Sequence, residues 1–231
     1  MYSFFKRMFD FIFSLIVLII LLPFMLPLII ALRVTGEGEI FYYQKRIGLH
    51  NKYFNMIKFA TMLKNSPKML TGTITVKNDP RLTPLGKFLR KSKLNELPQI
   101  LNVLKGDMSV VGPRPLVDIT FNAYPDSMRN KIYESKPGIT GIGSIVFRDE
   151  ESLISNAKMP PHQFYNTYIA PYKGELEIWY NNHKSFKTDL IIFFSTIWVV
   201  AFPNSNIIYK LFHDLPVRPD FFYTQNVQPT L

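Results

Sequence analysis

The longest apolar run of the chain lies near its N-terminus. Phe11 to Leu32 is a run of 22 residues without a charge, and a straight helix of that length just crosses a bilayer core of about 30 Å. Pro23 and Pro27 lie inside the run, and each removes a backbone donor and clashes with the preceding turn. The pattern therefore predicts a membrane helix that bends at Leu22-Pro23.

Positive charges flank this run on both sides. Lys6 and Arg7 precede it, and Arg33 and Lys45 follow it. The positive-inside rule draws both ends toward the cytoplasm, which favours a helix that enters the membrane and returns to the same face. A bent single crossing is the alternative. No small-residue cleavage site of a signal peptide follows the run, so both alternatives attach the protein to a membrane.

Shorter patterns predict a mixed, helix-rich α/β fold beyond the apolar run. Loose alternation over 40–63 indicates short strands or a hairpin. Leucines at helical spacing predict a helix that begins near Asn95, a good N-cap, and stops at Gly106. The other expected elements are a turn-rich loop at 64–80, a basic helix at 85–91, a helix at 119–134, a glycine-rich turn at 137–144, and a core or interfacial helix at 190–202.

Charge and composition narrow the possible functions. The net charge is +10, and residues 33–148 alone carry 19 Lys and Arg against 8 Asp and Glu. Such a basic block suits nucleic acid, an anionic membrane or phosphorylated substrates, and the membrane helix argues against nucleic acid. The chain has no cysteine and four scattered histidines, which excludes disulfides and cysteine nucleophiles and argues against a histidine metal site.

Glu96 is the first candidate for chemistry. It follows three cations, Arg90, Lys91 and Lys93, near the start of a predicted helix. A well-capped helix with a solvated basic approach explains this pattern. This explanation is favoured by the pattern alone, and an anion site is the alternative, with Glu96 holding a divalent metal that bridges phosphates.

A second candidate is Arg114, which lies between two prolines. Pro113 and Pro115 fix the backbone on each side, so a guanidinium suited to a phosphate is presented with little ordering cost. A rigid turn with an exposed arginine is the alternative. The backbone amides of 137–144 could also face a phosphate, although ordinary turns produce such runs; Arg148 is a further cation beyond them.

These segments together resemble one family, the bacterial sugar transferases or monotopic phosphoglycosyl transferases. The resemblance covers residues 6–200, and its ordered set of motifs is specific. The matching segments are Lys6-Arg7-x-x-Asp10, Gln44-x-Arg46-x-Gly48, Lys58-Phe59-x-Thr61-Met62, Asp79-x-Arg81-x-Thr83-x-x-Gly86-x-x-x-Arg90, Glu96-Leu97-Pro98-Gln99, Asn102-Val103-Leu104-Lys105-Gly106-Asp107-Met108-Ser109, Gly112-Pro113-Arg114-Pro115 and Pro137-Gly138-Ile139-Thr140-Gly141.

The resemblance implies a fold, a reaction and a location. We expect a re-entrant helix kinked near Pro23 (1–33), a cytosolic catalytic domain with interfacial helices (34–203) and a C-terminal extension (204–231). The implied reaction moves a sugar 1-phosphate from a UDP-sugar to polyprenyl phosphate, releases UMP and initiates a surface glycan. The implied place is the cytoplasmic face of a bacterial inner membrane. The expected partners are the two substrates and membrane lipids, with a homo-oligomer left open.

The matched motifs also imply the site residues. Glu96 is the expected Mg²⁺ ligand, and Asn95 occupies the position where the family typically carries a nucleophilic Asp. The family's Lys-Phe-Arg-Thr-Met motif likewise has Ala60 in place of the arginine. The phosphate-binding candidates are Arg90, Arg114, Arg81, Arg148 and Lys58, and the membrane-anchor candidates are Lys6, Arg7, Asp10 and Pro23.

Asn95 leaves four explanations open, because an uncharged amide is a poor nucleophile. The polyprenyl phosphate could attack the diphosphate directly, since phosphoryl transfer depends mainly on positioning and charge neutralisation. Glu96 or a carboxylate of 149–151 could replace the nucleophile. The chain could also be an inactive, substrate-binding scaffold of the pathway, or Asn95 could be an engineered change. We favour an active transferase.

Overall fold

The computed structural model describes residues 2–66, 80–203 and 205–222. Most of the loop expected at 64–80, including Asp79 of the motif, therefore lies outside the described residues. The helices are α1 (Tyr2–Val34), α2 (Pro84–Lys91), α3 (Gln99–Lys105), α4 (Asp118–Asn122), α5 (Asp126–Ile132), α6 (Ile142–Val146), α7 (Glu150–Asn156), α8 (Pro161–Phe164), α9 (Ala170–His183), α10 (Phe186–Ala201) and α11 (Ile207–Leu211). The strands are β1 (Phe41–Ile47), β2 (Tyr53–Phe59), β3 (Ser109–Val111) and β4 (Gly138–Thr140).

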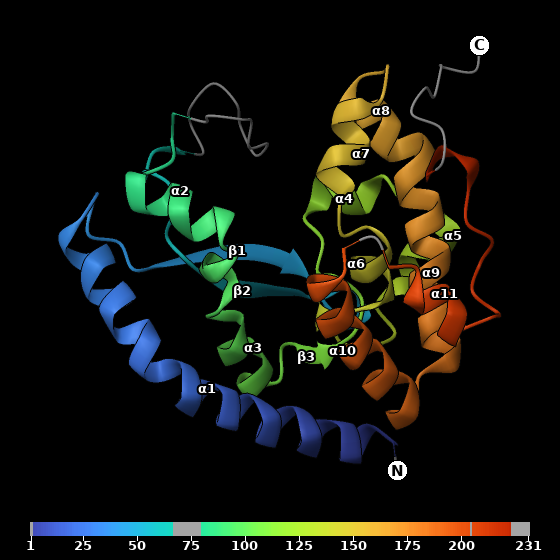
Figure 1. Ribbon diagram of the computed structural model, residues 1–231, viewed down its shortest axis with the longest axis horizontal. Coiled ribbons are helices and arrows are strands. Elements are labelled where there is room, and N and C mark those ends of the chain that lie inside the picture. The colour runs from blue at the N-terminus through green and yellow to red at the C-terminus, as the bar shows by residue number, and fades with distance from the viewer. Residues whose placement is uncertain (1, 67–79, 204, 223–231) are drawn as a thin grey trace. The chain divides into compact units, whose positions relative to one another are not determined.

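The protein is a helix-rich mixed α/β chain with a long apolar N-terminal helix, as predicted (Figure 1). The chain divides into two compact units. The first comprises Met1–Met8, Arg46–Phe54 and Asp107–Leu231, and the second comprises Phe9–Lys45 and Asn55–Gly106. Strands β1 and β2 pair as the predicted hairpin and pass through both units.

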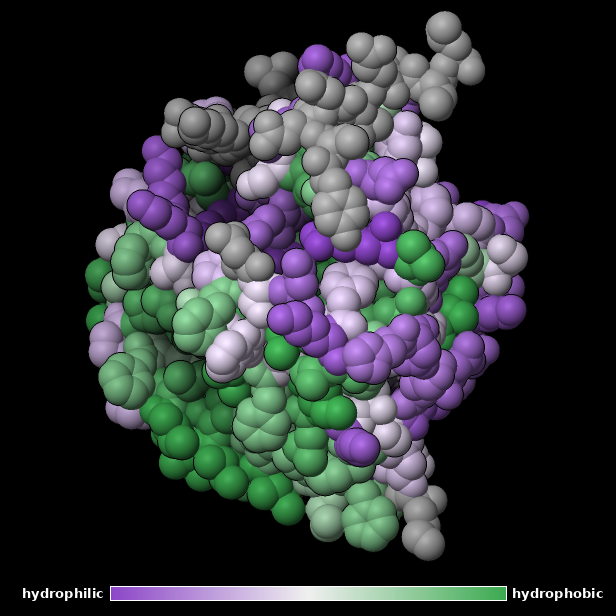
Figure 2. Space-filling view, turned by 45° about the vertical axis from the view of Figure 1, so that its right-hand side comes forward, coloured by the Kyte–Doolittle hydropathy of each residue, from purple (hydrophilic) through white to green (hydrophobic). Residues whose placement is uncertain are grey.

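Helix α1 buries a few side chains in the second unit and leaves most of its large apolar side chains exposed. Met25 and Leu32 are buried with Phe59 of β2 and Leu89 of α2. Only 11% of its most apolar 18-residue window is buried, and its exposed side chains form part of the green surface at the lower left of Figure 2. An exposed apolar helix of 33 residues is suited to a lipid environment and not to a soluble core.

The two prolines lie within α1 and do not end it. The helix continues through Pro23 and Pro27, and Figure 1 shows its axis changing direction about midway. Ser14 also donates a hydrogen bond to the Asp10 carbonyl at 2.5 Å, a back-bond that bends helices. The predicted departure from straightness is therefore present.

The first unit is built on a short parallel ladder. Strand β3 pairs with β4, with Ser109 opposite Gly138 and Val111 opposite Thr140. Helix α9 packs against α5 and α6, and α10 packs against α6, β3 and β4. Helix α10 thereby covers the β3–β4 ladder.

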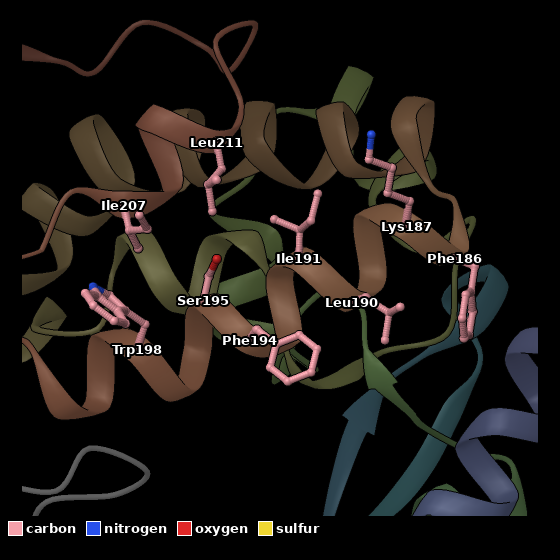
Figure 3. A pocket seen from close by; sticks show the side chains of 9 residues that line it. All are labelled: Phe186, Lys187, Leu190, Ile191, Phe194, Ser195, Trp198, Ile207 and Leu211. Atoms are coloured by element: carbon pink, nitrogen blue, oxygen red, sulfur yellow. The ribbon is translucent and has the colours of Figure 1, made fainter.

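Helix α10, which covers the stretch expected as a helix at 190–202, has one buried face and one exposed face. Ile192, Ser195 and Val199 are buried, whereas Phe194 and Trp198 are exposed. A hollow of about 530 Å³ lies between α10 and α11, where Ile191 and Ser195 face Ile207 and Leu211 (Figure 3). The other lining residues are Phe186, Lys187, Leu190, Phe194 and Trp198.

Two predicted helices need correction. The helix expected at 119–134 is split into α4 and α5, because Pro125 takes an extended conformation with ψ 143°. The helix expected near Asn95 begins only at Gln99, with Pro98 as its N-cap, although it ends at Gly106 as predicted. Asn95 instead lies in a short 3₁₀ turn, η3 (Leu94–Glu96).

Candidate active site

Helix α2 places Arg90 in the second unit. The Thr83 hydroxyl caps the helix by accepting a hydrogen bond from the Gly86 N–H at 2.9 Å. A Cβ at Gly86 would lie 2.1 Å from the Thr61 carbonyl oxygen, so only glycine allows the first turn to lie this close to the segment after β2. Arg90 follows one turn later, half-buried near the helix end.

A left-handed residue turns the chain between Arg90 and Glu96. Lys93 has φ 61°, a conformation that is uncommon for residues other than glycine. The 3₁₀ turn that follows buries Asn95, which is 7% exposed, and leaves Glu96 partly exposed. The predicted pair of adjacent polar residues is therefore split between the interior and the surface.

Lys58 of β2 meets Glu96 directly. Its Nζ lies 2.9 Å from Oε1 of Glu96, and the two side chains are 14% and 29% exposed. Asn102 of α3 fixes the position of β2 relative to α3. Its Oδ1 accepts the Ile57 N–H at 2.9 Å, and its Nδ2 donates to the Asn55 carbonyl at 2.8 Å. The structure thus unites two predicted site residues that are 38 positions apart.

Magnesium binding by Glu96 stays a prediction, which can be compared with the donors that Mg²⁺ requires. No group of three or more His, Cys, Asp or Glu side chains gathers among the described residues, so a cage made only of protein ligands is absent there. Mg²⁺ usually keeps several waters and binds one or two carboxylates together with substrate phosphates. A single, partly exposed carboxylate such as Glu96 meets that requirement.

Arg81 lies in the interior of the same unit. It is 2% exposed, and its Nη1 donates to the Ser66 carbonyl at 3.2 Å. Its backbone carbonyl accepts the Leu63 N–H. These contacts connect the segment after β2 to the approach of α2, and the phosphate-binding role of Arg81 stays a prediction.

Arg114 lies in the first unit, on the turn that follows β3. The Gly112 N–H donates to the Thr140 carbonyl at 2.9 Å, and the Gly138 N–H donates to the Pro113 carbonyl at 2.8 Å. A Cβ at Gly138 would lie 2.2 Å from the Gly112 nitrogen. The turn is therefore packed backbone against backbone, while the Arg114 side chain is exposed.

This packing also assigns a role to the glycine-rich segment. The Gly138 N–H is used within the protein, and a Cβ at Gly141 would lie 2.1 Å from the Gly112 carbonyl oxygen. At these two positions the close approach of the Arg114 turn explains the glycines. A phosphate is not needed to account for them.

Arg148 is engaged with its neighbours in the first unit. Its Nη1 donates to the Val199 carbonyl of α10 at 2.6 Å, and its Nε donates to Asp149 at 3.2 Å. These bonds hold the end of α6 on the end of α10. Phosphate binding by Arg148 stays a prediction.

The anchor residues at the N-terminus make internal contacts. Lys6 Nζ lies 2.7 Å from Oδ2 of Asp189, which also accepts a hydrogen bond from the Tyr2 hydroxyl at 2.8 Å. Asp189 is 4% exposed and accepts a third hydrogen bond, from Tyr180, at 2.7 Å. Lys6 thus ties the start of α1 to α10.

The other anchor candidates differ in exposure. Asp10 is 2% exposed, Arg7 is half-buried and Pro23 is exposed. Sequence reasoning missed Asp189, which stands in the first turn of an apolar helix. A lone carboxylate in such a stretch is the available signal, because a buried charge requires a partner.

Comparison with known proteins connects the whole arrangement to one family. A profile described as bacterial sugar transferase matches residues 1–203. The exopolysaccharide production protein ExoY of Sinorhizobium fredii is 34% identical over 210 residues, which are 85% of each chain. The undecaprenyl-phosphate galactose phosphotransferase of Salmonella typhimurium is 35% identical over 183 residues, 73% of this chain and 35% of that protein.

A third relative has a more specific name. The UDP-glucose:undecaprenyl-phosphate glucose-1-phosphate transferase of Klebsiella pneumoniae is 40% identical over 145 residues. The match covers 61% of this chain and 30% of that protein. This chain therefore spans about the length of the ExoY protein and about a third of the two longer transferases.

Proposed function

Since the chain belongs to the bacterial sugar transferase family and is a phosphoglycosyl transferase, we propose that it moves a sugar 1-phosphate from a UDP-sugar to polyprenyl phosphate. An oxygen of the polyprenyl phosphate forms a bond to the sugar-bearing phosphorus, and the bond from that phosphorus to UMP breaks. The products are polyprenyl-diphosphate-sugar and UMP. This step starts a surface polysaccharide, in keeping with the similarity to the exopolysaccharide production protein ExoY.

The Lys58–Glu96 pair beside Asn95 is the observation that carries the proposal. A diphosphate needs both a cation and a metal ligand, because its reaction depends on positioning and on neutralising negative charge. Lys58 supplies a positive charge at the point where Glu96 presents its carboxylate. Arg90 on α2, in the same unit as this pair, adds a guanidinium group suited to phosphate oxygens. The proposed phosphate-binding role of Arg114, in the other unit, rests on the matched motif.

We assign the magnesium ion to Glu96 and to the diphosphate. When bound, Mg²⁺ neutralises phosphate charge and polarises the phosphoryl oxygens. Asn95 offers an amide that can donate to a phosphate oxygen but cannot form a covalent phosphosugar as an Asp would. The proposal is therefore direct transfer between the two substrates.

We further propose that α1 is re-entrant and that catalysis takes place at the cytoplasmic face of the bacterial inner membrane. One substrate is dissolved in water and the other carries a lipid chain, so the reaction has to take place where both can arrive. Cations precede and follow the apolar run, which favours the cytoplasm for both ends.

Asn95 also supports a second candidate, a substrate-binding protein without turnover. Both candidates bind the nucleotide sugar, so binding does not separate them. Release of UMP from a panel of UDP-sugars, with polyprenyl phosphate and Mg²⁺, does. The chain is compared with Asn95→Asp and Glu96→Ala.

We expect turnover by the unchanged chain and a loss of about a hundredfold or more in Glu96→Ala, as for other groups that neutralise charge in a transition state. Activity only in Asn95→Asp would overturn direct transfer and indicate a site that has lost its nucleophile. No turnover in all three proteins across the panel would favour the binding protein.

A further inference from the structure

Glu177 is a buried carboxylate in the middle of α9 that the proposed reaction does not use. It is 2% exposed, and its Oε2 has no hydrogen-bond partner among the described residues. Buried carboxylates are costly unless they bind something, so the contacts of the other oxygen indicate why this residue is there.

The carboxylate of Glu177 accepts a hydrogen bond from the backbone N–H of Arg114. A Cβ at Gly143 would lie 2.4 Å from Oε1 of Glu177, so the carboxylate packs against α6 at a position that has no side chain. Lys173, one turn earlier on α9, is also buried and pairs with Glu150 of α7. Glu177 is therefore held between Gly143 of α6 and the turn that carries Arg114.

Tyr133 holds the other backbone polar group of Arg114, its carbonyl. Its hydroxyl donates to the Arg114 carbonyl at 2.7 Å and accepts the Leu116 N–H at 2.9 Å. Tyr133 is 1% exposed. Arg114 thus has its N–H and its C=O bound by two buried side chains, while Pro113 and Pro115 restrict the backbone on each side.

We propose that Glu177 and Tyr133 are positioning residues for Arg114, and that together they aim its guanidinium at a phosphate of the nucleotide sugar. Two side chains from α9 and from the end of α5 hold one exposed arginine, an arrangement that a plain surface turn does not require. Pre-organisation of this kind lowers the ordering cost of binding. That the phosphate belongs to a nucleotide sugar rests on the proposed function. That Glu177 and Tyr133 fix the backbone of Arg114 does not depend on it.

The experiment compares three changes on α9 in the full-length chain. Glu177→Met keeps the length of the side chain and removes the acceptor, whereas Glu177→Gln keeps one acceptor oxygen. Glu175→Met is the matched control, because Glu175 lies on the same helix and is exposed. Amide hydrogen exchange is followed in a peptide that covers 112–116, where prolines leave only the amides of Gly112, Arg114 and Leu116.

We expect exchange at Arg114 to become about tenfold faster in Glu177→Met, since a factor of ten corresponds to about 1.4 kcal/mol, the size of one intramolecular hydrogen bond. The KM for the UDP-sugar should rise by a similar factor, with a smaller change in kcat. Glu177→Gln should stay close to the unchanged chain in both readouts, and Glu175→Met should match it.

Tyr133→Phe provides a second route if Glu177→Met fails to fold. It removes one hydroxyl, and it should raise the KM in the same way while the melting temperature changes little. Unchanged Arg114 exchange and unchanged KM in the folded variants would overturn the inference. If the unchanged chain shows no turnover, the proposed function fails, and the exchange rates alone decide whether these residues hold the turn.

Discussion

The carboxyl group of Glu177 titrates far from its ordinary range. Complete burial raises its pKa from 4.5 to about 7, against the opposing effects of Lys173 and of the Arg114 N–H. The folded state therefore binds this proton more tightly than the unfolded state does. The stability that the protonated group contributes is fully present below pH 4.5 and is lost as the pH rises through about 7.

Glu177→Gln should remove this dependence on pH. Relative to the unchanged chain, the free energy of unfolding of the variant should increase by about 3 kcal/mol between pH 4.5 and pH 8, the equivalent of the pKa shift. Urea unfolding in detergent at several pH values measures the difference. Glu175→Gln is the control, and a difference that does not change with pH would contradict the assignment.

Short motifs are enough to propose some candidate site residues. Glu96, Arg90 and Arg114 are candidates because of local patterns of charge and proline. Glu177 could not be found in this way, because its partner Arg114 lies 63 positions earlier in the chain (177 − 114). Only the packing of α9 against the turn after β3 brings the two residues together. Asn95 was misplaced as an N-cap, because Lys93 takes the left-handed conformation before it.

At the scale of elements, α10 combines a buried charge network with an apolar exposed face. Asp189 near its start binds Lys6 and Tyr2 of α1, while Phe194 and Trp198 are 62% and 48% exposed. The start of the apolar helix and the exposed face of α10 thus belong to the same unit. We expect both to contact the lipid surface.

Trp198 can report on this contact, because the chain has only two tryptophans. In Trp179→Phe, the emission of Trp198 should be strongly quenched by vesicles whose acyl chains carry bromine. In Trp198→Phe, the remaining Trp179 is 6% exposed and should be quenched much less. Equal quenching of the two variants would show that α10 does not face lipid.

Elements with a local signature were predicted well. The β1–β2 hairpin, the basic helix α2 and the stop of α3 at Gly106 are confirmed. The division of 119–134 at Pro125 was missed, although a proline disfavours helix at the residue before it. The strands β3 and β4 have only three residues each, too few for a period to appear, and their pairing is a tertiary contact.

The chain as a whole combines a net charge of +10 with one apolar helix. Charge speeds the approach to anionic lipid and is screened by salt, whereas burial of apolar surface is not. Capture by anionic vesicles should therefore slow markedly between about 0.05 and 1 M salt, because the Debye length falls from above 10 Å to about 3 Å over this range.

Protein that is already bound should behave differently. Once α1 has entered the bilayer, a wash with salt on the order of 1 M should leave the protein in the vesicle pellet, because the helix and not the charge holds it. Flotation of vesicles before and after the wash measures retention. Release of most of the protein by salt would mean that α1 does not insert.

The contacts of Gly112, Gly138 and Gly141 bear on how this enzyme can be re-engineered. At each of these positions an added methyl group would lie 2.1 to 2.2 Å from a backbone atom of the facing segment, so saturation libraries there should yield almost no folded clones. A search for variants with a new sugar preference therefore gains nothing by randomising these three glycines. Library diversity is better placed on exposed side chains that the turn presents, where substitutions leave the main chain undisturbed.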